Sequence, residues 1–204
     1  MFIFLILCIF HFLSIFYFPS NPVLFLTKIT PILFLIYTYY KKIGINSIIR
    51  KLIFFGLIFS LLGDSFLAFE GYFVPGLGSF LIAQILYSIG FSKQGKLHIL
   101  RLIPFLVLGG LLYLYLLPSL PNGLIIPVSI YVLALVTMAW RASSRSIPTS
   151  KLNMSMAGAS IFLVSDALIA LTKFKSFPIM YPSFFIMVTY YLAQYLLVNS
   201  CKND

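Results

Sequence analysis

The sequence predicts an all-α polytopic membrane bundle of about eight transmembrane helices. Of its 204 residues, 61% are hydrophobic and only 9% are charged, whereas soluble domains carry about 25% charged residues. Apolar stretches of roughly 17–20 residues recur between turn signals, the length that a helix needs to cross ~30 Å of hydrocarbon. Transmembrane strands would instead show alternating segments of about ten residues.

Breakers and basic stretches divide the chain into elements, which we treat as one transmembrane domain over residues 1–204. The first stretch lacks the basic segment and the cleavage site of a secretory signal peptide, so it is interpreted as a helix. The turn signals that follow include the Pro19–Pro22 segment, Glu70-Gly71 and the Pro118–Asn122 segment. The expected spans are 2–18, 22–40, 52–69, 73–91, 98–117, 123–140, 155–172 and 178–198.

The basic residues, which give a net charge of +10, lie mainly at the predicted helix ends. Eleven of the fourteen lie in the loops after the second, fourth and sixth spans or in the C-terminal tail. Only Lys173 and Lys175 lie in the opposite loops. The positive-inside rule therefore predicts both termini in the cytoplasm, and compact loops favour a bacterial inner membrane. This distribution indicates topology signals and lipid contact, so no nucleic-acid partner is expected.

Two of the four acidic residues, Asp64 and Asp166, lie inside long apolar runs. Insertion scales penalise such a group by roughly 2.5–3.5 kcal/mol at the helix centre. At ~1.5 Å per residue, both aspartates and Lys28 lie in one layer, roughly 20 Å from the cytoplasmic boundary. Two carboxyl groups that meet in a water-poor site would share a proton, one neutral and one ionised. We therefore expect an aspartate pair that performs acid–base chemistry or transport.

The two halves of the chain also resemble each other. Gly56 and Asp64 recur as Gly158 and Asp166 at an offset of 102 residues. The pair Ala83-Gln84 recurs as Ala193-Gln194 in the second half. This predicts a duplicated four-helix unit in parallel orientation, a 4+4 repeat.

The other polar residues of the spans have structural and functional interpretations. Lys28 is either the counter-ion of the aspartates or a phosphate-binding group. Lys173 either snorkels to the outer boundary or contacts a substrate phosphate. Gln84 and Gln194 either tie helices together or bind substrate. Ser165, Tyr87, Tyr131 and Tyr190 complete the candidate substrate-binding set. Cys8 and Cys201 show no metal-ligand spacing, so neither a metal site nor a disulfide is predicted.

Several stretches together resemble the lysoplasmalogenase family of multipass membrane proteins (the YhhN type). They occur in family order and cover most of the chain. The stretches are residues 28–31, 56–64, 80–87, 138–142, 158–174 and 189–194. One departure is Gln84, which stands where family members often have histidine; glutamine hydrogen-bonds but does not titrate.

The resemblance implies cleavage of the vinyl-ether bond of a lysoplasmalogen into a fatty aldehyde and glycerophosphoethanolamine or glycerophosphocholine. It implies Asp64 and Asp166 as the catalytic pair. Acid protonates the β-carbon of a vinyl ether, and water captures the oxocarbenium ion, so the chemistry needs an acid, an anion and water. No metal or cofactor is required, and the expected partners are the lysophospholipid, water and the bilayer.

The main alternative is a transporter in which the same aspartates form a proton or cation relay. An intramembrane aspartyl protease is less favoured, because the stretch before Asp64 reads Leu61-Leu62-Gly63 and not Gly-x-Gly.

Overall fold

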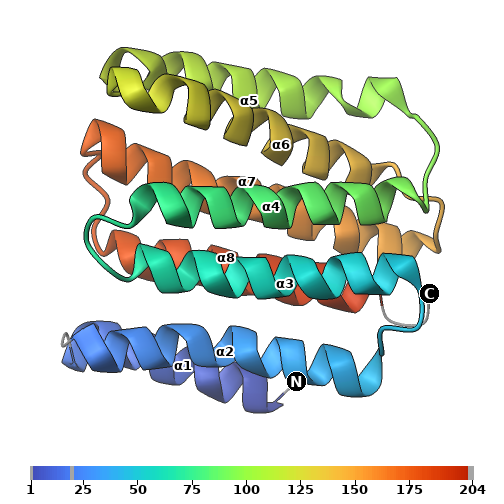
Figure 1. Cartoon of the computed structure of the whole chain (residues 1–204), viewed down its shortest axis with the longest axis horizontal. Helices are drawn as coiled ribbons and strands as arrows, with labels where there is room; N and C mark the ends of the chain where they lie inside the picture. The colour runs from blue at the N-terminus through green and yellow to red at the C-terminus, as the bar shows by residue number, and fades with distance from the viewer. Residues whose placement is uncertain (1, 19–20, 202–204) are drawn as a thin grey trace. The chain divides into compact units, whose positions relative to one another are not determined.

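The computed structural model describes residues 2–18 and 21–201, and every regular element in these ranges is helical (Figure 1). These ranges hold eight α-helices at the positions of the eight predicted spans. The α-helices are α1 (Phe2–Tyr17), α2 (Asn21–Lys42), α3 (Ile48–Leu67), α4 (Phe73–Ser92), α5 (Ile103–Leu116), α6 (Ile125–Ser143), α7 (Thr149–Lys175) and α8 (Pro182–Ser200). Short 3-10 helices are η1 (Ile99–Arg101), η2 (Leu117–Ser119) and η3 (Asn122–Leu124). The prediction of a polytopic helical membrane bundle is confirmed.

Helix is the expected state of such segments, because a lipid-facing backbone must satisfy its polar groups internally. Within the described residues, five helical segments are long and apolar enough to cross a membrane: Pro22–Lys42, Phe73–Ser92, Ile99–Ser119, Asn122–Ser143 and Thr149–Lys175. The other three α-helices, α1, α3 and α8, do not meet these criteria of length and composition, each for a different reason. α1 is apolar but has 16 residues. α3 carries Arg50, Lys51 and Asp64, and α8 carries Gln194 and several tyrosines.

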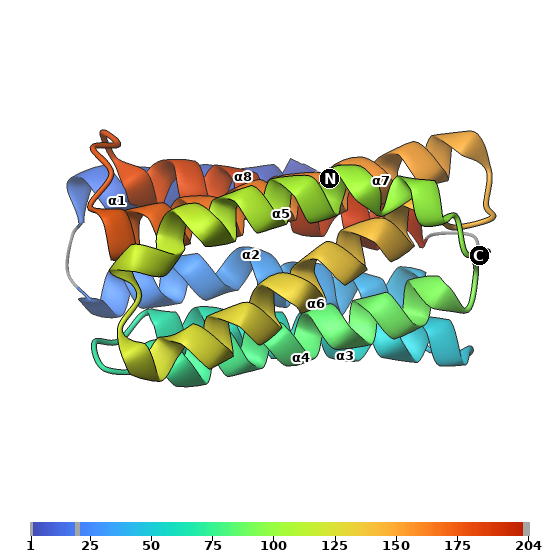
Figure 2. The same cartoon turned by 90° about the horizontal axis from the view of Figure 1, so that it is seen from above.

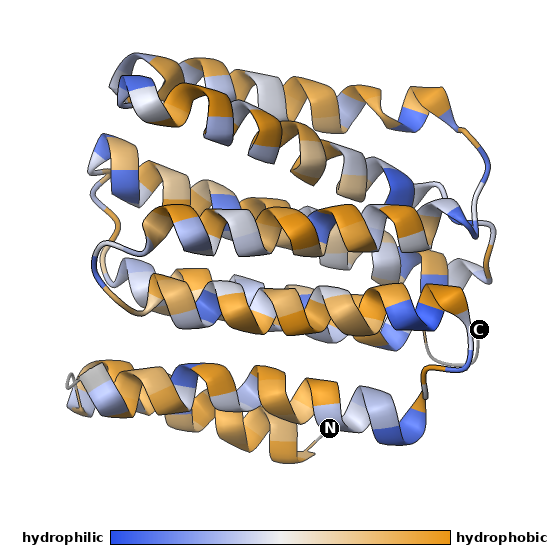
Figure 3. Ribbon diagram, viewed as in Figure 1, coloured by the Kyte–Doolittle hydropathy of each residue, from blue (hydrophilic) through white to orange (hydrophobic). Residues whose placement is uncertain are grey.

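Figure 3 shows the resulting distribution of hydropathy. The helices are apolar along most of their length, and hydrophilic residues gather near helix ends and in the loops. Many large apolar side chains are exposed on α1 and α5, including Phe2 and Leu111. Such exposure suits lipid contact and would be unfavourable in water.

Helix ends are set by local signals. Ser47 caps α3 by accepting a hydrogen bond from the amide of Arg50 at 3.2 Å. Pro104 lies in the first turn of α5, and Pro182 is the first residue of α8, positions at which proline loses no helical hydrogen bond. Ser176 caps the C-terminal end of α7 and adopts the left-handed conformation with φ of 46°.

The chain divides into two compact units. The first comprises the described residues up to Tyr87 together with Cys201, and the second comprises Ser88–Ser200. In the first unit α1 contacts α2, and α2 contacts α3. In the second, α5 packs on α6, α6 on α7, and α7 on α8, with a smaller contact between α5 and α7. Figures 1 and 2 show α1 beside α2, and α7 beside α8, as antiparallel neighbours.

Candidate active site

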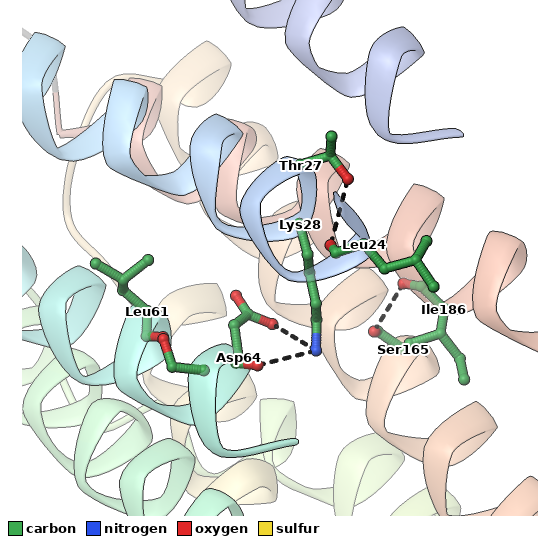
Figure 4. Close-up of polar contacts among 8 residues, drawn as sticks. Leu24, Thr27, Lys28, Leu61, Asp64, Ser165 and Ile186 are labelled. Atoms are coloured by element: carbon green, nitrogen blue, oxygen red, sulfur yellow. Dashed lines mark hydrogen bonds and ion pairs between the residues drawn. The ribbon is translucent and has the colours of Figure 1, made fainter. Parts of the chain in front are cut away.

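The acid of the first unit, Asp64, is buried on α3 with 3% of its surface exposed. Lys28 of α2 reaches across to it, as Figure 4 shows. The ammonium Nζ lies 3.6 Å from Oδ1 and donates a hydrogen bond to the backbone carbonyl of Asp64 at 3.1 Å. A buried carboxylate is stable only with compensation of this kind. Lys28 thus lies in ion-pair contact with Asp64.

Two glycines of α3 leave room for aromatic rings of α4. A Cβ atom at Gly56 would overlap the ring of Tyr87. A Cβ at Gly63, the residue before Asp64, would lie 2.5 Å from a ring carbon of Phe80. The two rings occupy the space beside these glycines and so restrict the position of the α3 segment that carries Asp64.

A buried polar cluster on α1 and α2 includes Thr27, the residue directly before Lys28. His11 Nδ1 and the Thr27 hydroxyl lie 3.0 Å apart, and the Ser14 and Thr27 hydroxyls lie 2.7 Å apart. All three side chains are buried. Because Thr27 directly precedes Lys28, this cluster fixes the register of the helix that carries the lysine.

The acid of the second unit, Asp166, is buried on α7 with 9% exposed. Tyr131 of α6 donates its phenolic hydrogen to Asp166 Oδ2 at 2.6 Å. The preceding residue, Ser165, donates its hydroxyl to the carbonyl of Ile186 on α8 at 3.2 Å (Figure 4). These two contacts tie the segment of α7 that bears the acid to α6 on one side and to α8 on the other.

α7 packs closely on α8, and a glycine on α7 lies against the α8 backbone. A Cβ at Gly158 would lie 3.0 Å from the backbone nitrogen of Leu197 and 3.1 Å from the carbonyl of Ala193. Further along, the rings of Phe162 and Tyr190 meet edge to face with centroids 5.9 Å apart. The glycine and the aromatic pair together set the distance between the two helices.

Three contacts in the first unit have counterparts in the second, and the sequence offset is 102 or 103 for every residue but one. His11–Thr27 corresponds to Tyr113–Ser129, whose hydroxyls lie 2.7 Å apart, with an offset of 102 for both residues. Lys28–Asp64 corresponds to Tyr131–Asp166, with offsets of 103 and 102. Gly56–Tyr87 corresponds to Gly158–Leu197, with offsets of 102 and 110. These matched contacts support the predicted repeat at the level of packing.

Residues 23–201 match the profile of the YhhN family. The chain belongs to the YhhN family. It is 37% identical to lysoplasmalogenase TMEM86A of Bos taurus and 38% identical to that of Homo sapiens, each over 155 residues. Both alignments cover 72% of this chain and 64% of the relative. It is 34% identical to lysoplasmalogenase TMEM86B of Homo sapiens over 71% of this chain and 60% of that protein. The matched region is thus less than two thirds of each relative's length. No solved structure shows a significant match.

The remaining predicted site residues of this YhhN-family chain are divided between the two units. Gln84 and Tyr87 are fully buried on α4 in the first unit, where the Tyr87 ring packs against Gly56. Tyr190 and Gln194 are buried on α8 in the second unit. Lys173 is exposed near the end of α7. The structure thus brings Lys28 to Asp64 and Tyr131 to Asp166, and it uses Ser165 as a helix tie.

Two arginines counted only as topology signals prove to be buried structural residues. Arg141 Nε donates to the Ser92 hydroxyl at 2.8 Å, and its other nitrogens donate to carbonyls at the end of α4 and the following loop. Arg145 donates to the Gln94 side chain at 2.9 Å and to the Ser200 hydroxyl at 2.7 Å. They stabilise carbonyl-rich helix ends, which favour positive charge. Charge alone does not reveal this role, because exposed and buried arginines look alike in the sequence.

Metal ligation gains no support from the described residues. Among them, no group of three or more His, Cys, Asp or Glu side chains is placed to hold an ion.

Proposed function

We propose that this YhhN-family protein hydrolyses the vinyl-ether bond of lysoplasmalogens, releasing a fatty aldehyde and glycerophosphoethanolamine or glycerophosphocholine. The observation that carries the proposal is a buried carboxyl group in each unit, each held by a polar side chain from the preceding helix. The curated relatives, named lysoplasmalogenases, supply the substrate class. The proposed partners are the lysophospholipid, water and the surrounding bilayer.

The reaction makes specific demands on a protein. An acid must place a proton on the β-carbon of the vinyl ether, which leaves an oxocarbenium ion. An anion must stabilise that cation, and a base must activate the water that captures it. Asp64 and Asp166 are the proposed catalytic pair, and their helices provide the water-poor surroundings in which electrostatic stabilisation is strongest.

The other polar residues are proposed to bind and orient the substrate. Gln84, Tyr87, Tyr190 and Gln194 are buried hydrogen-bonding groups on α4 and α8. Ser165 and Tyr131 are proposed to shape the surroundings of Asp166, and Lys28 those of Asp64. Lys173, seven residues beyond Asp166 and exposed, is the proposed contact for the substrate phosphate.

The proposal is tested by aldehyde release from purified protein, comparing a lysoplasmalogen with the matched alkyl-ether lipid, which lacks the double bond. Hydrolysis of the first alone is expected. Asp64→Asn and Asp166→Asn should each lower the rate by ~10²–10⁴-fold, the usual contribution of a general acid or base. Glu70→Gln is the matched control, because Glu70 is the exposed acid between α3 and α4 and its loss should leave the rate unchanged.

Full activity in both asparagine variants would refute the catalytic assignment. Ion flux into proteoliposomes that is lost in the same variants, without any hydrolysis, would favour the transport alternative. Each variant is first checked for intact helix content and melting behaviour, so that a folding defect is not read as a catalytic one.

The proposed setting is a bacterial inner membrane with both termini in the cytoplasm. Support for the orientation comes from the eleven basic residues assigned to one side against two on the other.

A further inference from the structure

We propose that the connection between α4 and α5 is a binding site for an anionic phospholipid headgroup at the membrane boundary. The site comprises residues 93–101, called here the 93–101 segment, which lies entirely within the second unit. Three basic residues of the segment hold the phosphate, and three apolar residues contact the adjoining acyl chains. These residues are Lys93, Lys96, Arg101, Leu97, Ile99 and Leu100. The inference is independent of the hydrolase proposal, because it needs neither aspartate and no catalysis.

The 93–101 segment lies where two candidate membrane spans meet. The helical stretches on either side, Phe73–Ser92 and Ile99–Ser119, are both long and apolar enough to cross a membrane. Only residues 93–98 separate them. A connection of this length, which runs out and back, reaches no more than ~10 Å beyond the helix ends. The segment is therefore held in the layer where lipid headgroups meet acyl chains. The predicted topology puts it on the cytoplasmic side, where the leaflet is anionic.

Contacts with the end of α6 hold the backbone of the segment in place. Trp140 Nε1 donates a hydrogen bond to the carbonyl of His98 at 2.9 Å. Arg141 Nη1 donates to the carbonyl of Lys96 at 3.2 Å. Both donors lie in the last turn of α6. Because the backbone is already fixed, binding a headgroup costs little additional ordering of the chain.

The basic side chains of this fixed backbone remain exposed. Lys93 and Lys96 are exposed. Arg101 is also exposed, although one of its guanidinium nitrogens donates to the carbonyl of Ser143. The sequence has no acidic residue between positions 71 and 165, so no carboxylate from this stretch competes for the three cations. A phosphate group has the charge that complements them.

The apolar side chains of the segment favour a lipid over a soluble phosphate. Leu97 is 77% exposed, Ile99 is 61% exposed and Leu100 is 76% exposed. In water such exposure would be unfavourable. At a membrane boundary it suits a ligand whose phosphate and acyl chains lie side by side, because basic and apolar residues then each contact the matching part of one molecule.

The experiment is native mass spectrometry of the purified full-length protein in detergent, titrated with dioleoyl phosphatidylglycerol or dioleoyl phosphatidylcholine. The anionic lipid is expected to bind ~10-fold or more tightly than the zwitterionic one, because two or three basic residues contribute to the difference. Raising the ionic strength should reduce this preference, since salt screens exposed charges. Equal affinity for the two lipids would overturn the proposal.

Lysine variants test whether the preference belongs to this segment. The double variant Lys93→Gln with Lys96→Gln should weaken phosphatidylglycerol binding by ~25-fold, about fivefold for each lysine removed. The matched control is Lys41→Gln with Lys42→Gln, which removes two exposed lysines from the end of α2 and should leave the affinity nearly unchanged. Equal weakening by both double variants would show diffuse charge attraction in place of a site. Melting temperatures measured without added lipid check that each variant is folded.

Two further measurements distinguish a lipid ligand from a free phosphate. Glycerophosphoglycerol, the same headgroup without acyl chains, should bind far more weakly than the lipid. Leu97→Ser with Leu100→Ser should weaken lipid binding although all three basic residues remain. Tight binding of glycerophosphoglycerol, or unchanged lipid binding in the serine variant, would show that the segment does not recognise a lipid.

Discussion

At the scale of the residue, a carboxyl group inside a membrane bundle needs a specific partner. Asp64 has the Lys28 ammonium and Asp166 has the Tyr131 hydroxyl, both from the helix that precedes it in its repeat. Some glycines are needed because a larger side chain would overlap a neighbouring residue. Gly56 leaves room for the buried Tyr87 ring, whereas no atom lies within 4 Å of a Cβ built at Gly78.

Gly56→Ala is therefore expected to destabilise the protein by ~1–3 kcal/mol, the usual effect of overpacking a well-filled core. The new methyl group would overlap a ring that is fully buried and has little space to move. Gly78→Ala on α4 is the matched control and should be neutral or stabilising, since alanine favours helix. Thermal unfolding in detergent measures both, and equal melting temperatures would show that Tyr87 moves aside at little cost.

At the scale of the element, the sequence predicted where helices occur better than where they end. α7 begins at Thr149, six residues before the expected start, because the polar residues after Pro148 continue the helix beyond the apolar run. α5 begins later than expected, at Ile103, because residues 99–101 form a 3-10 turn. Hydropathy marks the lipid-matched part of a helix, and local hydrogen bonding decides the rest.

Thr27→Val should weaken the association of α1 with α2. The change removes the hydroxyl that meets both His11 and Ser14, and an interhelical hydrogen bond in a membrane contributes roughly 0.6–1.7 kcal/mol. Thr38→Val is the control on the same helix, because the Thr38 hydroxyl donates to the α2 carbonyls of Phe34 and Leu35. Chemical unfolding in mixed micelles compares the two, and an equal effect of both substitutions would contradict a special role for Thr27.

At the scale of the whole molecule, the described chain forms two compact units, and matched contacts recur in each. Four helices per copy return the chain to the side where it began, so a four-helix repeat keeps its orientation in the membrane. The positive-inside rule predicts the same direction for both copies.

Cysteine labelling tests this orientation. Glu70→Cys and Lys93→Cys place single thiols at exposed positions on either side of α4, in a background with Cys8 and Cys201 replaced by serine. A membrane-impermeant maleimide applied to intact cells should label the first and not the second, because the predicted topology puts Lys93 on the basic, cytoplasmic side. In inverted vesicles the reagent should label Lys93→Cys and not Glu70→Cys. Labelling of Lys93→Cys in intact cells would disprove the predicted topology.

The sequence by itself determined the helical membrane class, the eight helices and the choice of the two aspartates. Long apolar runs and rare buried acids are strong signals, because lipid permits few other structures and penalises charge. Only the tertiary structure decided that Lys28 pairs with Asp64, that Tyr131 bonds to Asp166, and that Arg145 is buried. A helix that is apolar on most sides gives little indication of which face turns inward, and its rotation is settled by packing against helices distant in the sequence.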